Sequence, residues 1–294
     1  MPDTIYRRRF GDRKDGRLIR SLPALNKFAP FVMRTRSDST NYFSDSIEIT
    51  EIDRWLRAKQ AEGYEDMGML HVLIAAYVRT IAHRPGLNRF LSGQRVYARH
   101  NIEVIMLVKA AMTDEAEETS IKAKFLPTDT IFDVYRKINK EIDIVKANDD
   151  SVNSAKFAEA FTRVPRILIN GFMLIARFLD YFGWLPRTLL DISPFHGSMM
   201  LADLGSLGIP PVFHHLYNFG NLPLSITFGT ERNVIELAET GRPVAKKYVD
   251  YTVAMDELIC EGFYYATSLK FIKYFLRNPA ILESPPEKVE QDIF

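Results

Sequence analysis

Two short segments of the sequence carry the residue types that could do chemistry. The segment DELICEG places the single cysteine, Cys260, between Glu257 and Glu261, where a thiol could carry an acyl group. The segment HHLYNFG places His214 beside His215, and a neutral imidazole accepts a proton readily near pH 7. For Cys260 we favour a small buried packing residue. For the histidines we favour a structural pair in a turn, with a displaced functional histidine as the alternative.

The other histidines and the glycines predict neither a metal nor a nucleotide. His71, His83 and His100 fall on expected helices or strand edges without the spacing of metal ligands, so we predict no metal. His196 is a further imidazole that could fold near a subunit seam. The sequence has no G-x-G-x-x-G after a strand and no Walker pattern, which argues against dinucleotide and nucleoside triphosphate binding.

The nearly equal numbers of basic and acidic residues give the protein no strong overall electrostatic field. Thirty-eight Lys and Arg against 37 Asp and Glu leave a net charge of +1, so we predict no nucleic acid partner. In residues 1–41, aspartates dilute the arginines and no apolar run of signal-peptide length follows. We expect a solvated amino-terminal arm lying on a neighbouring subunit, with contact to phosphate or acidic headgroups as the alternative. One cysteine excludes an internal disulfide, and we interpret the protein as cytoplasmic.

Hydrophobic periodicity predicts strands and helices of one domain over residues 42–294. A capping box of Thr50 and Asp53 is expected to start one helix. Further helices are expected from Met67 to Pro85, over 129–147 and from Gly262 to Leu276. Strands are expected at 46–49, in a hairpin of 101–111 with 119–125, at 246–255, and in the runs SMMLADLGSLG, VFHHLYNFG and PLSITFGT.

The least polar stretch is Arg166–Leu185. Arg177 and Asp180 interrupt it before it reaches the length of about 20 residues that a membrane span needs. We expect a mostly buried helix, in the core or at a subunit seam. A lipid-facing or acyl-chain-binding surface is the alternative.

Four blocks between Tyr42 and Leu282 resemble, in order, the catalytic domain of 2-oxoacid dehydrogenase acyltransferases, which shares its fold with chloramphenicol acetyltransferase. The blocks are SDSIEITEIDRWLRAK, HRPGLNRFLSGQRVYARHNIEV, SMMLADLGSLGIPPVF and DELICEG, the last followed by FLRNPAIL. The third is similar to the family's T-I-S-N-L-G-x-x-G segment and the fourth to its D-H-R-x-x-D-G segment. The resemblance implies an α/β two-layer sandwich, a mixed sheet with helices on one side, that closes as a homotrimer with clefts between subunits. Residues 42–294 would form that acyltransferase-like domain.

Carried across residue by residue, the resemblance puts Glu257 where the family has its catalytic histidine, Glu261 where it has an aspartate, and Ala202 where it has an oxyanion-stabilising hydroxyl. The remaining expected ligand-binding residues are Asp203, Gly205, His214, Asp256 and Gly262. Proton transfer from a thiol to a carboxylate is about 6 kcal/mol uphill, against about 3 kcal/mol for transfer to imidazole. Alanine also donates no hydrogen bond to an oxyanion.

Three functions are compatible with this pattern. We favour a non-catalytic relative that binds an acyl or coenzyme A-type ligand, or a partner protein, at the trimer seam, with no covalently bound cofactor. The second is an active acyltransferase that uses Glu257, or a histidine such as His215, as its base. The third is a membrane-peripheral structural scaffold that uses the helix in Arg166–Leu185.

Overall fold

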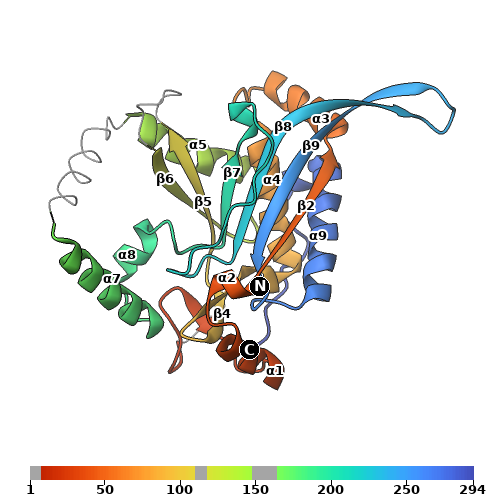
Figure 1. Ribbon diagram of the computed structural model, residues 1–294. Helices are drawn as coiled ribbons and strands as arrows, with labels where there is room; N and C mark the ends of the chain where they lie inside the picture. Colours follow the sequence, from red (N-terminus) through yellow and green to blue (C-terminus); the bar gives the residue numbers. More distant parts are fainter. Residues whose placement is uncertain (1–7, 110–117, 148–163) are drawn as a thin grey trace.

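A six-stranded mixed sheet forms the centre of the computed structural model, which describes residues 8–109, 118–147 and 164–294 (Figure 1). The strand order is β2-β9-β8-β7-β5-β6. The pairs β5/β7 and β7/β8 are parallel, and the other neighbours are antiparallel. The strands are β2 (Thr40–Glu48), β5 (Ile102–Lys109), β6 (Glu118–Phe125), β7 (Met199–Asp203), β8 (Leu224–Leu237) and β9 (Pro243–Asp256). The predicted pairing of 101–111 with 119–125 is confirmed as β5 and β6, and the turn between them lies outside the described residues.

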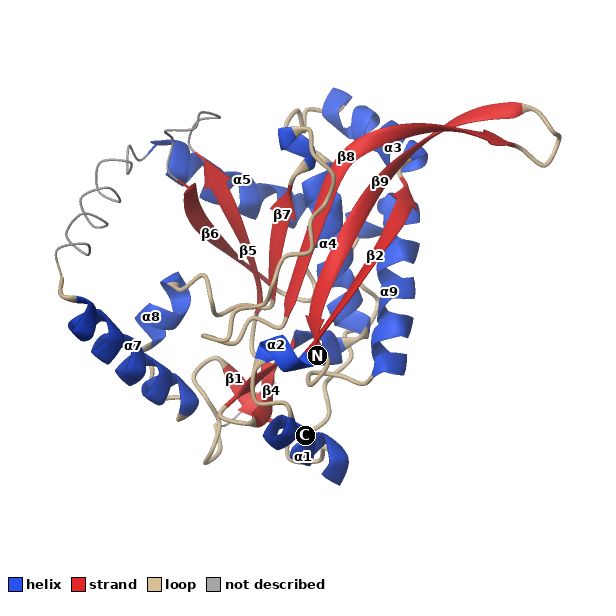
Figure 2. Ribbon diagram, viewed as in Figure 1, coloured by secondary structure: helices blue, strands red, loops and turns tan. Residues whose placement is uncertain are grey.

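Four long helices cover one face of this sheet, as Figure 2 shows. They are α3 (Thr50–Ala61), α4 (Met69–His83), α5 (Ile131–Ala147) and α9 (Gly262–Arg277). The helices expected at 67–85, 129–147 and 262–276 are therefore confirmed. The predicted capping box is wrong, because Thr50 is already the first helical residue and its hydroxyl accepts a hydrogen bond from the Lys247 backbone at 3.1 Å.

The alternation of side chains along β5 explains why both faces of the sheet need cover. Val104 and Met106 point into the main core beneath the helices, whereas Ile105 packs with Met200 and Leu222 on the opposite face. That opposite face is crossed by the irregular segment 208–223. The strand expected in VFHHLYNFG is wrong, because the backbone of residues 212–220 bonds to side chains rather than to a neighbouring strand. Thr252, for example, donates its hydroxyl to the Val212 carbonyl at 2.6 Å.

A second, three-stranded sheet in the order β1-β4-β3 joins the amino-terminal segment to the body of the same chain. Its strands are β1 (Gly16–Leu18), β3 (Arg89–Ser92) and β4 (Arg95–Arg99). Two short helices follow β1, namely α1 (Ala24–Val32) and α2 (Arg36–Ser39). The chain also has 3₁₀ turns at Pro85–Asn88, Gly205–Leu207 and Pro279–Glu283. From Gly16 onward the segment expected to be a solvated arm therefore packs on its own chain.

Helix α7 (Arg166–Tyr181) stands apart from the helical layer, with α8 (Arg187–Ile192) beside it (Figure 1). Its expected burial in the core is wrong: Ile167 is 78% exposed and Leu174 is 65% exposed. The helix is held instead through Asp180, which is buried and accepts a 2.7 Å hydrogen bond from Arg13. Burial against a second subunit stays a prediction. No helix in the described part of the chain is long and apolar enough to cross a membrane.

Asp15 fixes the amino-terminal segment to β4 through charge. It accepts hydrogen bonds from Arg13 at 2.9 Å and from Asn221 at 2.8 Å, and it lies 4.0 Å from Arg99. Burial disfavours the carboxylate, but the two guanidinium groups outweigh burial and hold the pKa of Asp15 at about 2.

Replacing this carboxylate with its neutral isostere, Asp15→Asn, should remove about 2 kcal/mol of unfolding free energy at neutral pH. Because the pKa is lower in the folded state, this contribution is complete above the unfolded value near 3.8 and is lost as the pH falls toward 2. Urea titrations at several pH values should show the difference from wild type shrinking in acid, while the exposed Asp143→Asn control shows no such trend. A difference independent of pH would contradict the assignment.

Candidate functional site

One half of the expected site lies where β7 ends. Ala202 and Asp203 are its last two residues, and Asp203 accepts a hydrogen bond from the Ser206 backbone at 3.1 Å. Burial raises the pKa of Asp203. Gly205 opens the following 3₁₀ turn, and a Cβ there would lie 2.7 Å from the Gly229 carbonyl oxygen. Glycine is therefore needed at this close approach of two backbones.

The other half of the site lies where β9 ends. Asp256 is fully buried, accepts hydrogen bonds from the Ser39 hydroxyl at 2.9 Å and the Leu258 backbone at 3.0 Å, and lies 3.8 Å from Arg36. The next residue, Glu257, is exposed and accepts a 2.7 Å hydrogen bond from the Asn41 side chain. The two adjacent carboxylates thus have opposite environments, one inside the protein and one facing solvent.

Arg36 connects this half of the site to the loop that crosses the sheet. Its guanidinium donates to the carbonyl oxygens of Tyr217 at 2.6 Å, Gly220 at 2.7 Å and Leu91 at 3.2 Å. Its Nε has no hydrogen-bond partner and lies 3.8 Å from the Asp256 carboxylate, which offsets part of the cost of burying the charge. The loop that crosses the sheet is therefore bonded to a residue of the amino-terminal segment.

The residues after Glu257 lead into α9. Cys260 is 4% exposed, and burial raises the pKa of its thiol to about 12, which confirms the packing interpretation. Glu261 precedes the helix with an exposed side chain that makes no capping hydrogen bond, and Gly262 is the first helical residue. Glu261 does not occupy a buried position of the kind that Asp256 holds.

The histidine pair lies in the crossing loop. The rings of His214 and His215 stack with centroids 5.1 Å apart. The His215 ring also lies edge-on to the Tyr217 ring, with centroids 4.9 Å apart. Glu257 bonds to Asn41 and not to either imidazole. His196 is buried elsewhere, with Nδ1 2.7 Å from the Ser193 hydroxyl and Nε2 3.3 Å from Asp180. The structure therefore does not bring these imidazoles to Glu257.

The strand register separates the two halves of the site within one chain. Ala202 lies opposite Thr227, and Thr227 lies opposite Thr252. Glu257 is five positions beyond Thr252 along β9, which at about 3.3 Å per residue is about 16 Å. Ala202 and Glu257 are therefore offset along the strand direction and lie on either side of β8. At this separation the two positions do not meet around one small reacting group within one chain.

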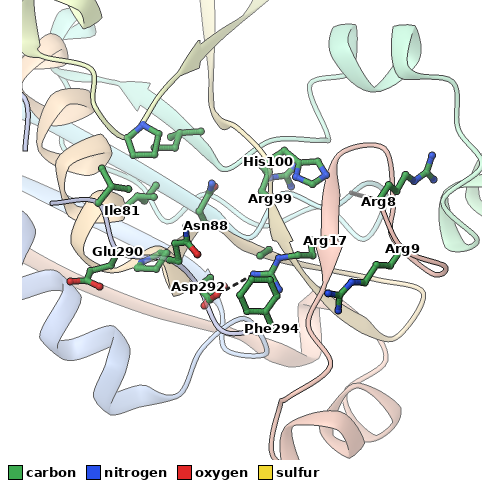
Figure 3. A pocket seen from close by; sticks show the side chains of 16 residues that line it. Arg8, Arg9, Arg17, Ile81, Asn88, Arg99, His100, Glu290, Asp292 and Phe294 are labelled. Atoms are coloured by element: carbon green, nitrogen blue, oxygen red, sulfur yellow. Dashed lines mark hydrogen bonds between the residues drawn. The ribbon is translucent and has the colours of Figure 1, made fainter. Parts of the chain in front are cut away.

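Figure 3 shows a separate cavity, whose volume is about 740 Å³ and whose lining contains none of the expected catalytic or ligand-binding residues. Arg8, Arg9 and Arg17 line it together with Glu290 and Asp292. Arg17 donates to the Asp292 carbonyl oxygen at 3.1 Å, and Arg89 pairs with the Asp292 carboxylate. These contacts beside the cavity hold the segment after α9 against the amino-terminal segment.

Among the described residues, no group of three or more His, Cys, Asp or Glu side chains could hold a metal ion.

Sequence reasoning missed Arg36, Ser39 and Asn41, the partners of the two adjacent carboxylates. They lie more than 200 positions from Asp256 and Glu257, just before or at the start of β2. The signal that could have found them is the antiparallel pairing of β2 with β9, which sets Thr40 opposite Asp256.

Removing the buried guanidinium, as in Arg36→Met, should lower the unfolding free energy by about 3 kcal/mol, because Asp256 would be left as an unpaired buried carboxylate. Chemical denaturation should show part of the loss recovered in the Arg36→Met, Asp256→Asn double variant. The exposed pair of Arg54 with Glu51 offers a matched control, since Arg54→Met should cost less than about 0.5 kcal/mol. Equal losses for Arg36→Met and Arg54→Met would contradict the role given to Arg36.

The comparisons with known proteins match this geometry at the level of the fold. No protein-family model and no curated protein matches the chain. Among solved structures, the cubic core of the pyruvate dehydrogenase multienzyme complex superposes with a TM-score of 0.58 at 11% identity, covering 90% of this chain and 93% of that one. A probable dihydrolipoamide acetyltransferase from Listeria monocytogenes has a TM-score of 0.56 at 15% identity, covering 88% and 94%. Chloramphenicol acetyltransferase has a TM-score of 0.52 at 12% identity, covering 89% and 99%. The chain thus has the fold that these acetyltransferase structures share, as the sequence motifs predicted.

Proposed function

We propose that this chain forms a homotrimer that binds an acyl or coenzyme A-type ligand between subunits and does not catalyse ordinary thioester transfer. The observation that carries the proposal is the separation of Ala202 from Glu257 by about 16 Å along the strand direction. A cleft that uses both positions is completed when a second copy supplies one of them. The likeness to a multienzyme core supports assembly of this kind.

The chemistry of Glu257 favours binding over catalysis. Its carboxylate faces solvent and accepts a hydrogen bond from the Asn41 side chain. A solvated carboxylate is too weak a base to deprotonate a thiol efficiently, since the pKa gap is worth about 6 kcal/mol. Ala202 supplies no hydroxyl for an oxyanion. The glutamate at position 257 and the alanine at position 202 therefore both disfavour acyl transfer to a thiol.

The intact scaffold around these positions favours a retained cleft. Asp256 is fully buried beside Arg36, and Gly205 keeps its tight approach to Gly229. Both contacts lie next to the substituted positions. We therefore infer that the ends of β7 and β9 keep a defined shape that can accept a ligand.

Isothermal titration with coenzyme A and acetyl-coenzyme A is expected to show saturable binding at one site per chain. Light scattering on the same sample should give three times the chain mass of 33.8 kDa. Acetyl transfer to a thiol should proceed at the buffer rate. Transfer that disappears in Glu257→Gln, but not in the exposed control Glu287→Gln, would replace this proposal with an active acyltransferase. If the chain has no affinity for any coenzyme A thioester, the proposed class of ligand is wrong.

Restoring both groups, in the Glu257→His, Ala202→Ser double variant, should raise acetyl transfer to a thiol by about two powers of ten over wild type. The base and the hydroxyl act in one step, so each single variant should gain much less than the double variant. Steady-state kinetics with acetyl-coenzyme A measures the gain. A double variant that binds coenzyme A but gains nothing would mean that the two positions do not share one cleft.

A further inference from the structure

Helix α7 presents a large apolar face to solvent. Phe172, Leu174 and Phe178 are between 55% and 65% exposed, and Trp184, just after the helix, is 59% exposed. The rings of Phe178, Phe182 and Trp184 touch, with centroid distances of 4.9 to 6.0 Å. Water-soluble surfaces do not normally carry so many contiguous exposed apolar side chains unless something covers them.

Helix α1 presents a second apolar face. Leu25 is 76% exposed, Phe28 is 61% exposed and Val32 is 66% exposed. These positions are separated by three and four residues, so they lie along one side of the helix. Phe10, which precedes β1, is fully exposed. The pattern of α1 therefore matches that of α7.

The tip of the β3–β4 hairpin joins the two helices. Gln94 donates a 3.5 Å hydrogen bond to the Pro30 carbonyl of α1 and accepts a 3.0 Å hydrogen bond from the Tyr181 hydroxyl of α7. A groove of about 860 Å³ runs over this junction and is lined by Phe10, Phe31, Phe182 and Trp184 among others. We name α1, α7, Phe10 and Trp184 together the apolar surface.

The exposed charges of the apolar surface are positive. No acidic residue occurs between Gly16 and Ser37, and the one acidic residue of α7, Asp180, is buried against Arg13. Lys27 and Arg177 are exposed on the two helices, while Arg8, Arg9 and Arg95 line the groove. This excess is local, because the whole chain has 38 basic and 37 acidic residues.

We propose that the apolar surface docks onto a membrane with anionic headgroups, its aromatic side chains entering the interface and its basic side chains contacting the headgroups. Aromatic and aliphatic side chains beside arginine and lysine are what an interfacial helix presents to such a lipid layer. Pairing this surface with itself across a two-fold axis fits less well, because such a contact would oppose like charges. The proposal is independent of coenzyme A binding.

The full chain is mixed with vesicles of phosphatidylcholine, with and without phosphatidylserine, and separated by flotation. Wild type is expected to float with the anionic vesicles at low salt and about tenfold less at high salt, because counterions screen the headgroups. Phe172→Ser, Phe178→Ser should reduce flotation at least about tenfold. Arg177→Glu, Lys27→Glu should reduce it on anionic vesicles only.

The matched control is Ile235→Ser, Leu237→Ser, which removes two side chains of similar exposure, 78% and 76%, from the far end of β8. This control should float like wild type. Failure of wild type to float on either vesicle, or equal flotation of all variants, overturns the proposal. Loss of the oligomer in Phe172→Ser, Phe178→Ser, with no flotation of wild type, would instead assign the surface to a contact between subunits and also overturn it.

Discussion

The register of three central strands is the constraint on which the rest of this structure depends. Parallel pairing of β7 with β8 and antiparallel pairing of β8 with β9 send the carboxyl ends of β7 and β9 in opposite directions. Residues that follow these two strands therefore lie apart within one chain. The same register explains why a long loop, residues 208–223, has to cross the sheet face between β7 and β8.

Buried guanidinium groups hold the two ends of this arrangement in place. Arg36 fixes Asp256 and the crossing loop, and Arg13 fixes Asp180 and with it α7. In each case the arginine comes from the first 41 residues and its carboxylate from the second half of the chain. Since an unpaired buried charge is costly, these pairs make the amino-terminal segment part of the structural framework. The resemblance aligns Glu261 with the family's aspartate. In the structure the side chain of Glu261 is exposed, whereas Asp256 is buried and paired with Arg36.

The sequence was sufficient for features that depend on local periodicity and insufficient for features that depend on distant partners. The apolar run of Val104, Ile105 and Met106 predicts a strand, and the structure confirms it as β5. Nothing local to Arg36 indicates that it will face Asp256, 220 positions away. The spacing of apolar residues in α7 predicts a helix with an apolar side but not what covers that side, so the expected core burial was wrong. The strand predicted for VFHHLYNFG was wrong for a related reason. Its short apolar runs resemble those of a strand, but in the structure this segment bonds to side chains of other elements.

Symmetry connects the two proposals. In a trimer with a three-fold axis, each copy of the apolar surface lies at the same height along the axis and faces the same way. Three such surfaces can therefore meet one plane together, provided that α1 and α7 lie toward one end of the axis. Once one copy contacts the bilayer, the other two are held near it at high effective concentration, so a weak contact by each copy becomes a strong contact by the assembly. A cleft completed between subunits and a membrane contact shared among subunits would then both depend on the same assembly.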